Sequence, residues 1–111
     1  MKDDHERLEH ILEAIEKIEK YSQTGRGAVK ENELILVWLL HHLQIIGEAA
    51  SKVTKDFQKT HATIPWAEIT AMRNILVHHY FDVDENEIWN AVEKDIPELK
   101  RKVSQILSQK K

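Results

Sequence analysis

The sequence predicts an all-α fold, an up-and-down bundle of four helices, and three observations support this prediction. Apolar residues recur at spacings of three and four along most of the 111 residues. No stretch alternates apolar and polar residues in the way of a half-buried strand. The one glycine-rich stretch separates the first two periodic segments. A chain of this length is expected to form a single domain, residues 1–111, with a sizeable core.

The first helix is expected from about Asp4 to Tyr21. Acidic residues gather at its start, where the positive end of the helix dipole stabilises them. Its apolar stripe consists of Leu8, Ile11, Leu12, Ile15 and Ile18. Residues 22–27 follow, with two glycines among small polar residues, and this composition is typical of a loop.

The second helix, from about Val29 to Thr54, is apolar on nearly every side through its middle. Such a helix should be covered all round, but a four-helix bundle of this length cannot wrap one helix completely. We therefore expect part of it to face a second copy of the protein. Gly47 inside this helix would let another helix approach closely, or it only relieves crowding in the core.

The third helix is expected from about Pro65 to His78 or His79, after a polar stretch over residues 55–63. A proline is favourable just inside a helix start, because its missing N–H would be unpaired there anyway.

The fourth helix is expected to begin at Asp84, which forms an N-terminal cap with Glu87 three residues later. Apolar residues keep helical spacing from there to the end of the chain. Pro97 lies within this run, and proline removes a backbone donor and clashes with the preceding turn. We expect the helix to be kinked or split in two near Pro97.

Composition and charge exclude several classes of protein. The net charge of −3 argues against a domain that coats nucleic acid through a general positive field, so any RNA contact must be local. The absence of cysteine excludes disulfides, thiolate metal sites and cysteine nucleophiles. The polar N-terminus does not resemble a signal peptide, and no apolar run approaches the roughly 18 residues of a membrane span. We expect a soluble cytoplasmic protein without membrane contact.

The residues suited to chemistry gather near the end of the third helix: Arg73, Asn74, His78 and Tyr80. Arginine offers a planar, permanently charged donor fork for phosphate oxygens. Histidine is the side chain whose unperturbed pKa, about 6.5, lets it transfer protons near neutrality. Together these groups can handle a phosphate ester without a metal. The alternative is structural: residues 75–77 are core, Arg73 is solvated, and His78 is a hydrogen-bonded packing residue.

Helical geometry separates the two central side chains. Because an ideal helix turns about 100° per residue, Arg73 and Tyr80 lie within about 20° of each other, and Asn74 and His78 within about 40°. Arg73 and His78 are about 140° apart on a straight helix. They converge on one phosphate only if the helix frays near His78 or a second copy contributes, which favours a dimer.

Metal sites and a basic patch are weaker interpretations. The histidine pairs at 41–42 and 78–79 supply four imidazoles, but the sequence contains neither His-Glu-x-x-His nor Glu-x-x-His. A calcium-loop template matches residues 82–93 at four positions, but Glu87 stands where the template requires glycine. We expect no metal and no cofactor. The basic run at 100–102 is expected to be a solvated helix face or a patch that contacts an RNA backbone.

Several separated motifs resemble one known family over nearly the whole chain. They are Ile45–Ala50, Ile64–Trp66, Arg73-Asn74, Val77-His78, Tyr80 and Asp95–Leu99. On these motifs the chain resembles the HEPN superfamily, specifically the HepT-like toxins that are paired with a minimal nucleotidyltransferase antitoxin of the MntA type. The family signature is an Arg, a polar residue, a His after four intervening positions and a Tyr two residues beyond. Here these are Arg73, Asn74, His78 and Tyr80, with no departure.

The resemblance implies a metal-independent endoribonuclease that acts as a homodimer, with the motifs of both subunits lining a shared cleft. Such a dimer would bring together the groups that one straight helix separates. The resemblance further implies that the antitoxin silences the toxin by transferring AMP to Tyr80. A bulky anion there would compete with the RNA phosphate for Arg73.

We hypothesise that Arg73 binds the scissile phosphate and stabilises the charge developing on it. His78 would act as general base toward the ribose 2′-hydroxyl or as acid toward the leaving oxygen, and Asn74 would orient His78 or donate to the phosphate. The expected ends are a 2′,3′-cyclic phosphate and a 5′-hydroxyl. The alternative is a catalytically idle helical module that binds a nucleotide or the nucleotidyltransferase partner.

Overall fold

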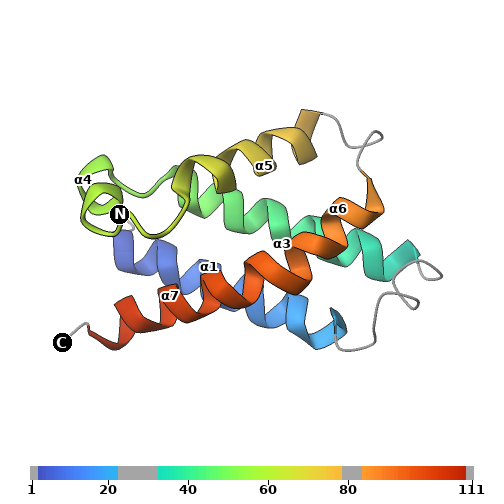
Figure 1. The fold of residues 1–111 in the computed structure, drawn as a ribbon, viewed down its shortest axis with the longest axis horizontal. Coiled ribbons are helices and arrows are strands. Elements are labelled where there is room, and N and C mark those ends of the chain that lie inside the picture. The colour runs from blue at the N-terminus through green and yellow to red at the C-terminus, as the bar shows by residue number, and fades with distance from the viewer. Residues whose placement is uncertain (1–2, 23–32, 79–83, 110–111) are drawn as a thin grey trace.

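Helix α3 (Glu33–Ser51) lies at the centre of the molecule, with α1 (Asp4–Ser22) and α5 (Trp66–His78) packed along it (Figure 1). The computed structural model describes residues 3–22, 33–78 and 84–109. The remaining elements are α4 (Lys55–Thr60), α6 (Glu85–Asn90), the π-helical segment η2 (Ala91–Asp95) and α7 (Ile96–Ser108). Segments α6, η2 and α7 follow one another as the fourth long element, which packs on α1. The described residues contain no strand, so the predicted all-α bundle is confirmed.

The long helices bury their apolar stripes in one common core. The largest side chains that are fully buried there are Leu8, Ile11, Ile15, Ile18, Leu39, Leu43, Ile46, Ile64, Leu76 and Val103. Burying one such side chain contributes about 1.5–3 kcal/mol relative to leaving it in water. The stripe predicted for the first helix therefore supplies a large part of the core.

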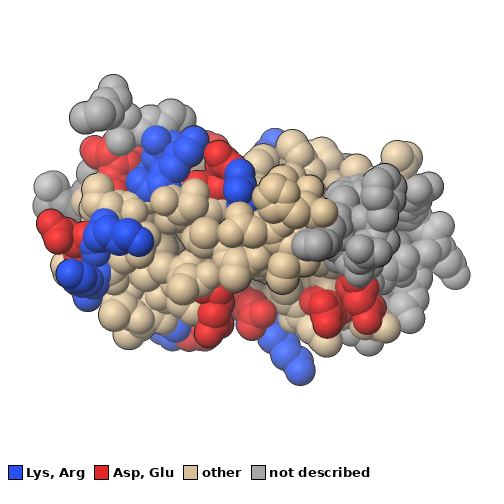
Figure 2. Space-filling view, turned by 90° about the horizontal axis from the view of Figure 1, so that it is seen from above, with Lys and Arg blue, Asp and Glu red and all other residues tan. Residues whose placement is uncertain are grey.

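One part of α3 lacks cover. Leu34 and Val37, in its N-terminal half, are 79% and 43% exposed, and Ile75 and Val77 of α5 are 53% and 44% exposed. In the view from above the α5 side, the middle of the molecular face carries few charged residues (Figure 2). The prediction that the chain alone leaves part of α3 uncovered is confirmed. The alternative that residues 75–77 are all core is wrong, since only Leu76 is buried.

α3 also contains the one stretch among the described residues, Leu34–Ser51, whose length and composition would suit a membrane span. The sequence predicts no apolar run near the length of a membrane span. By length and composition, this stretch contradicts that prediction. The stretch belongs to the central helix of the bundle, and 44% of it is buried inside the protein. Core helices have the same composition, so the stretch is weak evidence for a membrane.

The fourth helix is split just before Pro97, as predicted. Asp84 caps α6 by accepting a hydrogen bond at 2.8 Å from the backbone N–H of Asn86. The following turn, η2, is π-helical, and the N–H of Ile96 donates to the carbonyl of Ala91. A proline ring clashes with the carbonyl four residues earlier, and a widened turn makes room for it. Pro97 then lies in the first turn of α7, where its missing donor costs little.

Helix α4 is not predicted by the sequence, which contains only a polar stretch at this point. Thr54 caps it by accepting a hydrogen bond from the N–H of Phe57. Asp4 accepts hydrogen bonds from the backbone N–H of Thr54 at 2.9 Å and from its hydroxyl at 2.7 Å. The turn is therefore tied to the start of α1 by polar contacts that a periodicity of apolar residues cannot reveal.

Gly47 is the point of closest approach between α3 and α5. A Cβ built at this position would lie 2.1 Å from Cβ and 2.8 Å from Cγ of Arg73. Real Cβ atoms essentially never come this close, so only glycine fits. Of the two interpretations of Gly47, close helix approach is confirmed, but the approaching helix is α5 of the same chain.

We predict that Gly47→Ala lowers the free energy of unfolding by about 1–3 kcal/mol, because overpacking forces α3 and α5 apart. The gain in helix propensity from glycine to alanine, about 1 kcal/mol, acts in the opposite direction. Urea unfolding followed by circular dichroism measures the change, and Ser51→Ala, at an exposed position on α3, is the matched control. A Gly47→Ala variant as stable as the wild type would show that this contact does not constrain the two helices.

Candidate active site

Helix α5 carries Arg73, Asn74 and His78, three of the four predicted site residues, in its second half. The helix begins at Trp66, directly after Pro65, and its buried residues fix which face turns toward α3. Arg73 is half-buried, whereas Asn74 and His78 are exposed. Arg73, the predicted cation, is thus part of the α3–α5 contact. His78, the predicted proton-transfer group, lies at the C-terminal end of α5.

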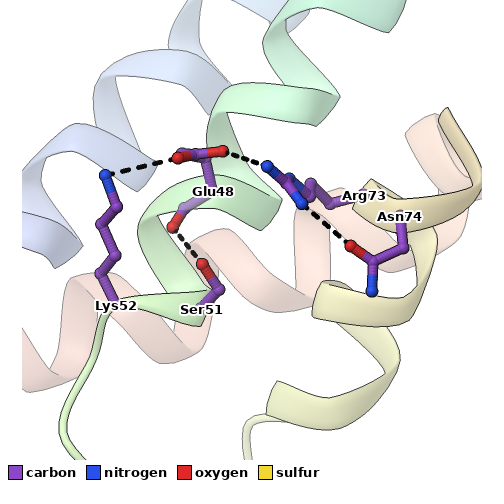
Figure 3. A network of polar contacts seen from close by, with 5 residues as sticks. All are labelled: Glu48, Ser51, Lys52, Arg73 and Asn74. Atoms are coloured by element: carbon purple, nitrogen blue, oxygen red, sulfur yellow. Dashed lines mark hydrogen bonds and ion pairs between the residues drawn. The ribbon is translucent and has the colours of Figure 1, made fainter. Parts of the chain in front are cut away.

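The Arg73 guanidinium is held from two sides (Figure 3). Its Nη2 donates to Oε2 of Glu48 at 2.8 Å, and its Nη1 donates to Oδ1 of Asn74 at 3.0 Å. The contact with Glu48 is also an ion pair between α5 and α3. Asn74 therefore contacts Arg73 in this structure, which fits a role in orienting the arginine.

Glu48 is the acidic centre of this network. The Arg73 hydrogen bond, and after it one from Lys52, lowers the pKa of the Glu48 carboxyl below its ordinary value. The Lys52 Nζ lies 3.3 Å from Oε1 of the same carboxylate. The Ser51 hydroxyl donates to the backbone carbonyl of Glu48 at 2.7 Å (Figure 3). Glu48 is therefore ionised at neutral pH and shared between two cations.

One buried donor of Arg73 remains unpaired. Its Nε is buried, and no acceptor in the described part of the chain bonds to it. A buried donor left unpaired costs about 1–3 kcal/mol. The arginine thus has hydrogen-bonding capacity that the described residues do not satisfy.

His78 does not meet Arg73 within the chain. It is the last residue of α5 and is exposed, and among the described residues no hydrogen bond joins the two side chains. Five residues of helix place them about 140° apart, as the sequence predicts. A single copy therefore does not assemble the arginine and the histidine into one site.

A surface groove of about 400 Å³ lies between α1 and α3, next to this network. Its polar and charged lining includes Arg7, His10, Glu13, Lys17, His41 and Glu48. Because Glu48 belongs both to the groove and to the Arg73 network, an extended ligand in the groove would reach the arginine.

Comparison with known proteins identifies the family. A family model described as "Ribonuclease HepT-like" matches residues 11–106. The chain is 37% identical, over 100% of both chains, to a candidate RNase of Caldanaerobacter subterraneus subsp. tengcongensis. The chain belongs to the HepT-like ribonuclease family. The resemblance found in the sequence motifs is therefore confirmed.

Two further relatives agree with membership of the HepT-like family. One, from Thermococcus cleftensis, is named "Probable ribonuclease HepT" and is 40% identical over 89% of this chain and 91% of its own. The other, from Methanocaldococcus jannaschii, is named both as a gamma-glutamylcyclotransferase and as a candidate RNase. It is 36% identical over 92% of this chain and 46% of its own length. No solved structure matches the chain.

One predicted HepT-like site residue, Tyr80, and two residues of the weaker metal interpretations, His79 and Asp82, lie outside the described residues. Tyr80 and His79 follow directly after the described end of α5, and Asp82 of the calcium-loop template lies in the same gap. Among the residues that the structure does describe, no group of three or more histidine and acidic side chains could hold a metal ion.

His42 is a packing residue. It is buried, its Nδ1 lies 2.8 Å from the backbone carbonyl of Trp38, and its ring packs against the Trp38 indole. Burial, above all, lowers the pKa of His42 below its ordinary value. The neighbouring His41 is exposed and lines the groove. Both histidines border the groove, and His41 is the more exposed of the two.

The basic run in α7 is engaged in contacts within the chain. Lys100 forms an ion pair with Glu19 of α1 at 2.7 Å, and Arg101 pairs with Glu98. Lys102 donates to the backbone carbonyl of Thr63 at 2.6 Å. These contacts favour a structural role over the alternative of an RNA-contacting patch.

Two residues of the network have no predicted role in the sequence. Glu48 belongs to the motif Ile45–Ala50, but nothing in its spacing links it to Arg73, 25 residues later. Lys52 is one lysine among many on polar helix surfaces. Gly47 is the one sequence feature that points to this network. A glycine inside a helix can indicate a close packing contact, but the sequence does not show which segment makes that contact.

Proposed function

We propose that this HepT-like ribonuclease is the toxin of a toxin–antitoxin pair and cuts RNA as a metal-independent endoribonuclease. The observation that carries the proposal is the arrangement on α5. Arg73 is fixed and charged at the α3–α5 contact, and His78 is exposed at the helix end. A phosphate-binding cation and a proton-transfer group are the two elements that cleavage by the ribose 2′-hydroxyl requires.

In the proposed reaction the 2′-oxygen forms a bond to phosphorus while the bond to the 5′-oxygen breaks. One His78 takes the proton of the 2′-hydroxyl, and a second His78 gives a proton to the departing 5′-oxygen. Arg73 stabilises the charge on the phosphate oxygens, and Asn74 keeps the guanidinium in orientation. The products are a 2′,3′-cyclic phosphate and a 5′-hydroxyl.

The working form is proposed to be a homodimer whose two copies meet over the exposed part of α3. α5 runs antiparallel to α3, and its C-terminal end reaches about the middle of α3 (Figure 1). Val37 of α3 and Val77 of α5 are both exposed, and Val77 is about 40° from Arg73 around the helix. A second copy covering these side chains would bring its own His78 toward Arg73.

Neutralisation is proposed to occur through a minimal nucleotidyltransferase antitoxin that transfers AMP to Tyr80, in the cytoplasm. The sequence places Tyr80 two residues beyond His78 and seven beyond Arg73, which is close to two turns of helix. An added phosphate there would compete for the same cation as the RNA.

An idle binding module is the second candidate function. In its favour, the protein's own carboxylate, Glu48, occupies Arg73, and a single chain does not bring Arg73 and His78 together. The cleavage experiment below separates the two functions.

We predict that the purified protein cuts single-stranded RNA in excess EDTA. His78→Ala should slow this by about 10²–10⁴, because general acid–base catalysis is lost. Arg73→Ala should slow it by about 10²–10³, because one stabilising donor group is lost. Gel analysis of labelled RNA measures the rates and end groups, with Thr70→Ala on α5 as the control.

Cleavage at equal rates by all of these variants would point to a contaminating nuclease, and the idle module would then be the better description. Ends with 5′-phosphate, or a requirement for magnesium, would overturn the proposed mechanism.

We predict that Val37→Glu weakens the dimer by at least tenfold, since a charged side chain would be buried at the interface. RNA cleavage should fall in parallel while the helical circular dichroism signal remains. Sedimentation velocity measures the assembly state, and Gln105→Glu, on the exposed side of α7, controls for added charge. A monomeric wild type, or an active monomeric variant, would contradict the shared cleft.

We predict that co-expression with a cognate minimal nucleotidyltransferase adds AMP to the wild type but not to Tyr80→Phe. Intact-mass spectrometry detects the adduct, and RNA cleavage by Tyr80→Phe should resist the partner. An adduct on another residue would refute the assignment of Tyr80.

A further inference from the structure

Two cations from different segments meet at one carboxylate on the surface of the protein. Arg73 of α5 approaches one oxygen of Glu48 at 2.8 Å, and Lys52, just after α3, approaches the other at 3.3 Å. The side chains are 29% exposed for Arg73, 46% for Glu48 and 51% for Lys52. All three side chains are therefore partly exposed at the surface, and they lie side by side in Figure 3.

The Glu48 carboxylate resembles a phosphate of RNA in the groups that it presents to the two cations. It presents two oxygens that share one negative charge, as the two non-bridging oxygens of a phosphodiester do. Arginine and lysine are the common protein ligands of phosphate, the former as a donor fork and the latter as a point charge. At present Arg73, Lys52 and Glu48 together carry a net charge of +1. If the Glu48 side chain turns away, the two positive charges of Arg73 and Lys52 can both act on one phosphate.

The unpaired Nε of Arg73 supports a change of partner. A native buried donor without an acceptor is rare, and Nε of Arg73 has no acceptor among the described residues. Glu48 accepts from Nη2 alone, so the fork formed by Nε and Nη2 is only half used. A phosphate that replaces Glu48 can accept from Nη2, and it can accept from Nε as well once the guanidinium has rotated so that this buried nitrogen faces the surface.

We propose that Lys52 and Arg73 form a two-cation clamp for one phosphate of an RNA strand, and that Glu48 is a resident anion which this phosphate displaces. The proposal rests on the proposed function in taking RNA as the ligand. It adds Lys52 as a binding residue and gives Glu48 an opposing role. The neighbouring α1–α3 groove, with Arg7 and Lys17 in its lining, provides a path by which the strand reaches the clamp.

Loss of the Lys52 charge and loss of the Glu48 charge are expected to change RNA affinity in opposite directions. Removing the Lys52 charge should weaken binding roughly three- to tenfold, since one charge-assisted contact is lost. It should also reduce the slope of log affinity against log salt by about 0.7, the value for one phosphate contact on a single strand. Removing the Glu48 charge should tighten binding by a similar factor, because the phosphate no longer competes with an internal anion.

The test uses the full chain and a fluorescent single-stranded RNA in which every ribose is 2′-O-methylated, so that it cannot be cut. Dissociation constants are measured over a range of salt concentrations for wild type, Glu48→Gln and Lys52→Gln. Lys55→Gln, which removes an exposed lysine three residues further on, is the matched control. Thermal unfolding of each variant shows whether the fold is intact, and cleavage of unmodified RNA is followed in parallel.

Tighter binding by Glu48→Gln and weaker binding by Lys52→Gln, with Lys55→Gln unchanged, would support the clamp. Weaker binding by Glu48→Gln would mean that Glu48 only positions Arg73, which overturns the displacement. If the wild type cuts RNA but Lys52→Gln behaves like Lys55→Gln, the clamp is wrong and the ribonuclease stands. If the opposite changes in binding occur without any cleavage, the clamp stands and the proposed cleavage is wrong. A wild type that does not bind the RNA at all contradicts both.

Discussion

The contact between Gly47 and Arg73 is the constraint on which the site depends. Because no side chain fits between the two helices at this point, the backbone of α5 lies close against α3. The Arg73 side chain therefore extends from the contact along the surface of α3. There Glu48, the residue after Gly47, accepts a hydrogen bond from its guanidinium. A glycine and an acid in sequence thus create both the space for the arginine and its counter-ion.

The same contact explains why the arginine is half-buried and the histidine is exposed. Arg73 lies on the side of α5 that faces α3, and a step of five residues turns His78 away from it. Packing of the core holds this rotation, since Ile69 and Leu76 are buried on the α3 side. The helix cannot turn to bring the histidine inward without exposing these residues, which is why we propose that a second copy supplies the histidine.

The protein has a net negative charge, and its basic side chains differ in how far they are engaged in contacts within the protein. In α7, Lys100 and Arg101 pair with acids and Lys102 also bonds a backbone carbonyl, so this run contributes to the bundle's own stability. Around Glu48 the cations remain at the surface and share one carboxylate. RNA recognition by such a protein would depend on a few local contacts, and would therefore be sensitive to salt through a small number of phosphates.

The sequence by itself determined the helical class, the long helices and their approximate limits, the split before Pro97, and the side chains that are candidates for phosphate chemistry. These follow from local rules, since apolar periodicity, caps and proline geometry act within a few residues. Only the tertiary structure decided that α5 is the helix that packs closely at Gly47, that Arg73 and Lys52 share the Glu48 carboxylate, that His42 is buried, and that α4 exists. Each of these depends on contacts between segments far apart in the chain, such as the 25 residues between Glu48 and Arg73 or the 50 between Asp4 and Thr54. One sequence shows which groups can form an ion pair or a close contact, but the choice among them is made by the packing of the helices.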